Sequence, residues 1–276
     1  MKKHTLRKFF YVSAITIFGS TAAMAQGTIY TIAGTGTAGL SGDSGPAAAA
    51  RLSQPHGVAT DGEGNVYIAD KMNNRIRKID GAGTITSVSG SGVAGWATGA
   101  PSLHYPSSVF TDASGEVLFN AWFNDMGFSY DPTTGSTHTR YGCGSQGSSG
   151  DDGPAHLAKT MTPTGACEDI YGNTYVADYG SNRIRRVDAA TGIITTIVNG
   201  GGAHGYTGDG GPAVSARTSN PSAVFFDPSS PGAGHLYFSD ANNNVIRKVD
   251  LNTGIITTVA GTGTAGFSGN FVMANT

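Results

Sequence analysis

Short runs of apolar, aromatic and β-branched residues alternate with turn residues along most of this chain. The runs are rich in Val, Ile, Tyr and Thr, and the segments between them are rich in Asp, Asn and Gly. β-branched and aromatic residues favour strands, and Asp or Asn followed by Gly favours tight turns. Glycine accounts for 42 of 276 residues, about twice the usual share, which turn-rich β structure tolerates better than helices do. The pattern predicts an all-β fold.

The same succession of strands occurs four times. Prolines mark the copies at intervals of 51, 57 and 58 residues: Pro55, Pro106, Pro163 and Pro221. Each proline begins a small-residue strand, which is followed by an aromatic strand, by a strand that carries Arg in three copies, and by a Thr-rich strand. Four-stranded units that recur at such a period are typical of β-propeller blades, whereas a β-sandwich has no reason to repeat the same residues.

The repeats set the predicted domain boundaries. A β-propeller domain is expected over residues 26–276, with blades at about 51–90, 103–142, 160–200 and 218–260 and with a fourth-type strand at 28–33 that has no blade of its own. Four complete repeats are visible, so we expect an incomplete five- or six-bladed ring and a chain that is a fragment of a longer one. If residue 276 is the true end, open strand edges favour self-association.

The motifs of these copies resemble NHL repeats. The residues that carry the resemblance are Pro-x-Gly-Val-Ala-x-Asp at 55–61, Gly-Asn-Val-Tyr-x-Ala-Asp at 64–70, Asn-Arg-Ile-Arg-Lys at 74–78 and Ile-Thr-Thr-Val-Ala-Gly at 256–261. The linkers Gly-Asp-x-Gly-Pro-Ala at 42–47, 150–155 and 208–213 resemble those of bacterial members. The resemblance covers nearly all of 26–276 and implies a β-propeller. It leaves function open, because such propellers include sensors, adhesion modules, RNA-binding proteins and a few lyases.

The first 25 residues have the three regions of a secretory signal peptide. Four basic residues precede an apolar stretch at 9–18, and Ala-Met-Ala at 23–25 is a suitable cleavage site before Gln26. An uncleaved anchor is the alternative. Cleavage removes four of the 17 basic residues and none of the 19 acidic ones, so the formal net charge changes from −2 to −6. We therefore expect a secreted, periplasmic or cell-surface protein with no membrane span and no nucleic-acid partner.

Acidic and basic residues recur at equivalent positions of three copies. They are Asp70 with Arg75, Asp178 with Arg183, and Asp240 with Arg247. Clustered acids could bind calcium or act as acid–base groups. Recurrence favours a structural role instead, in which Asp caps a turn and pairs with the Arg of the next strand.

The second copy diverges from the others. Asn120 stands where we expect the strand-ending Asp, and residues 121–126 replace the Asn-Arg-Ile segment. Trp122 and Phe123 in this copy are candidate ligand-binding residues, because aromatic side chains are favoured on recognition surfaces. Packing against the next blade is the alternative that the residue types favour. His56, at the start of an inner strand, and Tyr206, in the linker at 203–213, complete the candidates.

Two functions remain open at this stage. The first is a non-enzymatic module that binds a protein, peptide or glycan through loops between its blades, with no cofactor and no catalytic residue. The second is a metal-dependent lyase or hydrolase on the propeller axis that uses His56 and neighbouring acids. No zinc-type His or Cys motif supports a metal site. Cys143 and Cys167 could form a disulfide, but two free thiols fit the expected strand positions better.

Overall fold

The computed structural model describes residues 29–95, 102–229 and 232–266. The chain divides into two units, Met1–Thr31 and Ile32–Thr276, and the fold described below is that of the second. The signal peptide predicted at 1–25 lies outside the described residues. No helix within the described ranges is long and apolar enough to cross a bilayer.

Four antiparallel sheets follow one another along the chain, which confirms the predicted four repeats and the all-β propeller fold. Blade 1 contains β2 (Pro55–Thr60), β3 (Val66–Asp70), β4 (Arg75–Ile79) and β5 (Thr84–Ser89). Blade 2 contains β6 (Pro106–Thr111), β7 (Val117–Ala121), β8 (Met126–Asp131) and β9 (Ser136–Tyr141). Blade 3 contains β11 (Pro163–Glu168), β12 (Thr174–Asp178), β13 (Arg183–Val187) and β14 (Ile193–Val198). Blade 4 contains β15 (Pro221–Asp227), β16 (His235–Asp240), β17 (Val245–Asp250) and β18 (Ile256–Ala260).

Short 3-10 turns join the second and third strands of each blade. They are η2 (Lys71–Asn73), η3 (Trp122–Asn124), η5 (Tyr179–Ser181) and η7 (Ala241–Asn243). Each turn ends at a residue in the left-handed conformation, with φ between 51° and 59°: Asn74, Asp125, Asn182 and Asn244. Asn and Asp tolerate this conformation better than other residues with side chains, so an Asn or Asp at this position favours the end of the turn there.

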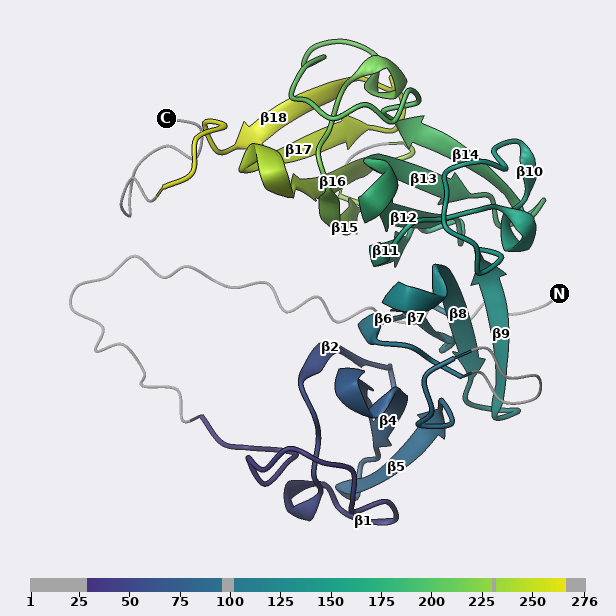
Figure 1. Ribbon diagram of the computed structural model, residues 1–276, viewed down its shortest axis with the longest axis vertical. Helices are drawn as coiled ribbons and strands as arrows, with labels where there is room; N and C mark the ends of the chain where they lie inside the picture. The colour runs from purple at the N-terminus through teal and green to yellow at the C-terminus, as the bar shows by residue number, and fades with distance from the viewer. Residues whose placement is uncertain (1–28, 96–101, 230–231, 267–276) are drawn as a thin grey trace, which may run out of the picture. The chain divides into compact units, whose positions relative to one another are not determined.

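Inner strands of successive blades pack directly on one another. β2 contacts β6, β6 contacts β11, and β11 contacts β15, and in Figure 1 these four strands lie toward one another while β5, β9, β14 and β18 lie outside. Each interface contains a cluster of buried apolar residues. Between blades 1 and 2, for example, Tyr67 and Ile76 of blade 1 pack with Val109 and Phe119 of blade 2. The hydrophobic core therefore consists of separate clusters between successive blades, because the apolar face of one blade is buried only when the next blade packs on it.

The linkers form part of the structure rather than free loops. Two-residue strands from the linkers, β1 (Gly45–Pro46) and β10 (Gly153–Pro154), pair with β5 and β14 and make blades 1 and 3 five-stranded. Short 3-10 turns follow: η1 (Ala47–Ala49), η4 (Ala155–Leu157) and η6 (Ala213–Ser215). Alanines of the linkers then pack in the core, such as Ala47 and Ala50 against Ile68.

Residues 29–33 form no strand, so the strand predicted at 28–33 is wrong over its described residues. A strand is held by hydrogen bonds to a neighbouring strand, and none of the four sheets includes this segment. Residue 28 itself lies outside the described ranges.

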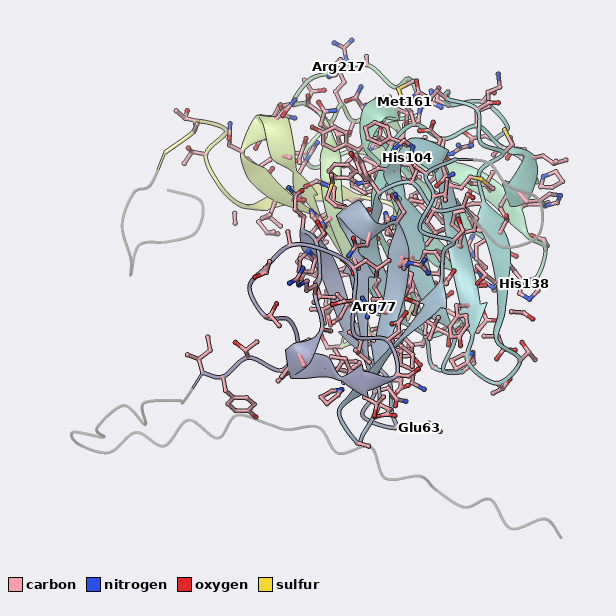
Figure 2. The ribbon with its side chains drawn as sticks, turned by 60° about the horizontal axis from the view of Figure 1, so that its bottom comes forward. Glu63, Arg77, His104, His138, Met161 and Arg217 are labelled. Carbon is pink, nitrogen blue, oxygen red and sulfur yellow. The ribbon has the colours of Figure 1, made fainter. Side chains whose placement is uncertain are left out.

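A fully buried arginine ties each of three linkers to its blade. In blade 3, an Arg185 Nη2 atom lies 2.6 Å from Asp151 of the linker, and Nη1 lies 3.8 Å from Asp178 at the end of β12. The equivalent sets are Arg77 with Asp43 and Asp70, and Arg247 with Asp209 and Asp240; Arg77 is labelled in Figure 2. Charges are kept in a protein interior when they are paired and hydrogen-bonded, and each of these arginines pairs with two carboxylates and donates a hydrogen bond to a backbone carbonyl.

The ion pair predicted for Arg75 and Arg183 falls to the arginine two residues further along the strand. Arg75 instead donates hydrogen bonds to the carbonyls of Gly90 and Ser91, and Arg183 donates one to Ser148. The linker aspartates Asp43 and Asp151 form their ion pairs with Arg77 and Arg185, and each also accepts a hydrogen bond from a hydroxyl of the outer strand. In blade 4 the predicted pair of Asp240 and Arg247 is the one observed, 3.6 Å apart.

Ala121, and not Asn120, occupies the position of the strand-ending Asp in blade 2. Pro106 pairs with Ala121 in the same register as Pro55 pairs with Asp70. In blade 1 the Asp70 carboxylate accepts the N–H of Ser53 at 2.7 Å. In blade 2 the side chain of Asn124 accepts the N–H of His104 at the same distance, so η3 supplies the missing cap.

Asp178 is the least well paired of the three buried acids. Among the described residues, its carboxylate accepts one hydrogen bond, at Oδ1, and Oδ2 is buried without a hydrogen-bond partner. Asp240 Oδ2 also has no such partner, but Asp240 Oδ1 accepts two hydrogen bonds, and Asp70 Oδ2 accepts the amide of Asn73 at 2.8 Å. Ser181 stands at the position of Asn73, and its hydroxyl donates to the backbone oxygen of Asp178. Burial raises the pKa of Asp178 from 3.8 to about 6, because the charged form loses its hydration.

Replacing Asp178 by asparagine is expected to change how stability depends on pH. Because the folded-state pKa of Asp178 is raised to about 6, its contribution is present below the unfolded pKa and is lost as the pH rises through 6. The free energy of unfolding of D178N minus that of the wild type should therefore increase by about 3 kcal/mol from about pH 3 to pH 7. Urea titrations at several pH values measure this difference, and a constant difference would contradict the assigned protonation.

The two cysteines are both free, Cys143 on the surface and Cys167 half-buried. Burial raises the pKa of the Cys167 thiol, so this thiol stays protonated at neutral pH.

Candidate functional site

Aromatic side chains from blades 1 and 2 gather around the turns η2 and η3. We call the group His56, Lys71, His104, Tyr105, Trp122 and Phe123 the aromatic patch. The patch lies at the end of the blades where second strands turn into third strands. Figure 2 shows the labelled His104 at this end and Glu63, in the turn between β2 and β3, at the other.

Lys71 lies between two rings of the neighbouring blade. Its ammonium nitrogen is 4.4 Å from the centre of the Trp122 ring and 5.6 Å from that of Tyr105. A cation over an aromatic face is attracted by the negative charge of that face, by about 0.5–1 kcal/mol at exposed sites. The contact fixes the Trp122 ring and brings a positive charge into the patch.

Phe123 presents an exposed ring in the patch. Its centroid lies 4.9 Å from that of His104 and 5.2 Å from that of Tyr105, yet its side chain is 47% exposed. Stacked neighbours hold the ring in place at little entropic cost to binding. The arrangement therefore offers a rigid apolar surface beside the Lys71 cation.

Trp122 carries an unused hydrogen-bond donor. Its Nε1 atom is buried and has no partner in the described part of the chain. A buried donor without an acceptor costs about 1–3 kcal/mol, so an acceptor that reached it would gain that amount. The structure thus brings Trp122 and Phe123 into one site, with Trp122 half-buried and Phe123 at the surface.

His56 also makes a hydrogen bond that joins two blades, in addition to its contact within the patch. Its Nδ1 atom lies 2.8 Å from the carbonyl oxygen of Ser107 in the next blade, and its ring lies 5.8 Å from that of Trp122. Residues at the same position of blades 2 and 3, Ser107 and Thr164, likewise donate to a carbonyl of the following blade. His56 joins blades 1 and 2 and supports the edge of the patch.

Tyr206 lies apart from the aromatic patch. Its hydroxyl is 2.8 Å from that of Thr258 on β18, and its ring lies under the buried guanidinium of Arg247, 5.4 Å away. These contacts belong to blade 4 and its linker. Tyr206 therefore covers the Arg247 ion pair rather than joining the other three candidates.

Sequence reasoning missed Lys71, His104 and Tyr105. His104 and Tyr105 directly precede Pro106, and Lys71 directly follows Asp70. The available signal was positional, because residues beside the repeat landmarks of adjacent blades lie at the same end of the propeller. The motif of one blade does not contain the contact of Lys71 with the Tyr105 and Trp122 rings, because Lys71 belongs to one repeat and the rings belong to the next.

Two clefts open at the opposite end of the blades. A cleft of about 570 Å³ between blades 3 and 4 is lined by residues that include Tyr171, Asn173, Arg186 and Leu251. A second, of about 370 Å³ between blades 2 and 3, includes Arg140 and Glu168. Burial raises the pKa of Glu168, although Arg140 lies 3.0 Å away. Among the residues described, no three or more His, Cys, Asp or Glu side chains are grouped to hold a metal ion.

Comparisons with known proteins agree with this architecture. The sequence model of the Teneurin NHL domain matches residues 24–103. Human NHL repeat-containing protein 2 is 27% identical over 243 residues, which cover 77% of this chain and 33% of the human protein. The chain thus spans about a third of that relative's length.

Solved structures share the fold at low sequence identity. An auxiliary nutrient binding protein from Bacteroides thetaiotaomicron is 21% identical with a TM-score of 0.56, over 80% of this chain and 50% of that one. Virginiamycin B lyase from Staphylococcus aureus is 20% identical with a TM-score of 0.51, over 74% of this chain and 54% of that one. Likeness at this level establishes the fold alone.

The four packed sheets define a β-propeller. Its repeats are similar to NHL repeats: the Teneurin NHL domain model matches part of the chain, and a relative that carries NHL repeats matches most of it at 27% identity.

Proposed function

We propose that this protein is an exported, non-catalytic binding module whose aromatic patch takes a protein, peptide or glycan ligand. The observation that carries the proposal is an exposed Phe123 ring beside a fixed Trp122–Lys71 pair, built from two blades. Aromatic side chains on rigid supports supply contact area at low entropic cost. The patch is mounted on short turns that the sheets hold in place.

Export is part of this proposal. The three regions at residues 1–25 support it, and so does the net charge of −6 that follows from removal of the four basic residues among them. A nutrient-binding protein among the structural neighbours is compatible with a binding role. The metal-dependent lyase is the alternative; within the described ranges, neither His56 nor the buried acids belong to a group of three or more potential metal ligands.

Tryptophan fluorescence tests the proposal directly. The chain has two tryptophans, so replacing Trp96 by phenylalanine leaves Trp122 as the only one. The protein is purified from its native host, and its intact mass should correspond to a chain that begins at Gln26. It is then titrated with neutral oligosaccharides and with a library of short peptides. We expect saturable changes in Trp122 emission with one probe class. The Phe123→Ala change should then weaken binding about tenfold or more.

Leu157 provides the control. It is an exposed apolar residue in η4, outside the patch, and Leu157→Ala should leave the affinity unchanged. If binding is lost on Tyr171→Ala but not on Phe123→Ala, the ligand occupies the cleft between blades 3 and 4 and the patch is not the site. An intact mass that corresponds to a chain beginning at Met1 would contradict export with cleavage of the signal peptide.

A further inference from the structure

Each blade has two different faces that meet in a fixed order. The face formed by Tyr67 and Ile76 in blade 1 packs on the next blade, and the face formed by Val109 and Phe119 in blade 2 receives it. We call these the back face and the front face. The same relation holds between blades 3 and 4, where Tyr175 and Ile184 pack on Leu236 and Phe238.

Two hydrogen bonds recur at these interfaces. The left-handed residue after each 3-10 turn accepts a backbone N–H from just before the next blade: Asn74 from Tyr105 at 3.1 Å, Asp125 from Thr162 at 2.7 Å, and Asn182 from Asn220 at 3.0 Å. The three donors share a left-handed backbone. The second bond runs from the residue after each proline to the following blade, as in Thr164 to the Ser222 carbonyl at 2.8 Å.

The back face of blade 4 has the same elements, but no further blade packs on it among the described residues. Phe225 is 64% exposed, and Ile246 is exposed where Ile76 and Ile184 are fully buried. Asn244 has the left-handed conformation of its counterparts, but it is exposed and its side chain makes no hydrogen bond within the described ranges. Ser222 bonds to Ser239 in its own blade.

The front face of blade 1 carries the complementary elements. Val58 is 66% exposed, whereas Val109 at the same position of blade 2 is 8% exposed. Gln54 has φ of 49°, close to the values at Tyr105, Thr162 and Asn220. Its N–H has no partner in the described part of the chain. The donor that this interface needs is therefore present and unused.

We infer that the back face of blade 4 binds the front face of blade 1 in a second copy of this chain. The pairing places Phe225 and Ile246 against Val58, and it supplies Asn244 with the N–H of Gln54, which continues the series seen at the three internal interfaces. Because the two faces differ, the contact is head-to-tail and leaves one free face at each end unless the copies close into a ring.

Light scattering after size-exclusion chromatography tests this inference. For the wild-type chain we expect a mass that is at least doubled and that rises with concentration. Phe225→Asp and Val58→Asp should each give a monomer, with association weakened by about a hundredfold or more, because a carboxylate would be buried without a partner. Both side chains are exposed in the single copy, so circular dichroism should show unchanged folding. Leu157→Asp, on neither face, should associate as the wild type does.

Mixing the two monomeric variants distinguishes this contact from others. F225D retains an intact front face and V58D an intact back face, so an equimolar mixture should form a dimer and nothing larger. A wild-type monomer up to sub-millimolar concentration would overturn the inference, and so would a mixture that remains monomeric. Association that survives both substitutions would show that another surface joins the copies and would overturn it too.

Discussion

Replacing Arg185 by methionine is expected to lower the free energy of unfolding by about 3–5 kcal/mol. The guanidinium is fully buried and donates to Asp151, at 2.6 Å, and to the carbonyl of Lys159, at 2.7 Å. Methionine fills a similar volume, so the loss comes from the polar groups that remain without partners rather than from a cavity. Urea unfolding followed by circular dichroism measures the effect.

The next residue on the same strand is the matched control. Arg186 is 34% exposed and pairs with Asp188 at 2.8 Å on the surface. Exposed ion pairs contribute about 0–1 kcal/mol, because water already solvates both partners. Arg186→Met should therefore cost less than about 1 kcal/mol. Equal losses in the two variants would show that burial of the Arg185 ion pair does not determine its contribution.

The predicted fold follows from features that lie within one repeat. Proline at the start of the first strand, Asp and Gly in the turns and β-branched strands are all local signals, and they located the four blades. The partners of the buried arginines could not be located in this way. Asp151 lies 34 residues before Arg185, and the linker that holds it looked like an exposed glycine-rich loop.

Blade 2 shows why residue type alone can mislead. Asn120 is polar and stands near the expected strand end, so the sequence suggested that it replaces the aspartate. Strand pairing places Ala121 there and moves the capping role to Asn124. The capping side chain has moved from the end of the strand to the following turn. Both segments contain an Asn, so residue types alone do not show the change, and only the strand register does.

The candidate site was predicted in part for a similar reason. Trp122 and Phe123 were identified because they interrupt the repeat, and the structure places them together. The contacts of Trp122 with Lys71 and His56 cross between blades, at separations of 51 and 66 residues. Such contacts become visible only when successive blades are superposed in space. Tyr206 was selected as an aromatic residue in a linker, yet its partners lie on its own blade.

Replacing Tyr141 by alanine is expected to lower the free energy of unfolding by about 3–5 kcal/mol, as removal of a buried aromatic ring does. Tyr141 is 2% exposed, and its hydroxyl donates to Asn120. It faces Gly127 in the sheet, where the other blades have an isoleucine facing a smaller residue. A side chain at Gly127 would collide with the Tyr141 ring. The ring therefore occupies the space that isoleucine fills elsewhere.

Unfolding measurements on combined variants test whether these residues form one unit. Gly127→Ile alone should cost about 1–3 kcal/mol or more, because the core has no room for it. The combination N120A/G127I/Y141S gives blade 2 the residues that blade 1 has at Ala69, Ile76 and Ser89. It should be more stable than the sum of its single changes predicts, by at least about 2 kcal/mol, since each change removes the conflict that another creates. Additive losses would mean that the three positions of blade 2 diverged independently and that Tyr141 does not take the place of the isoleucine.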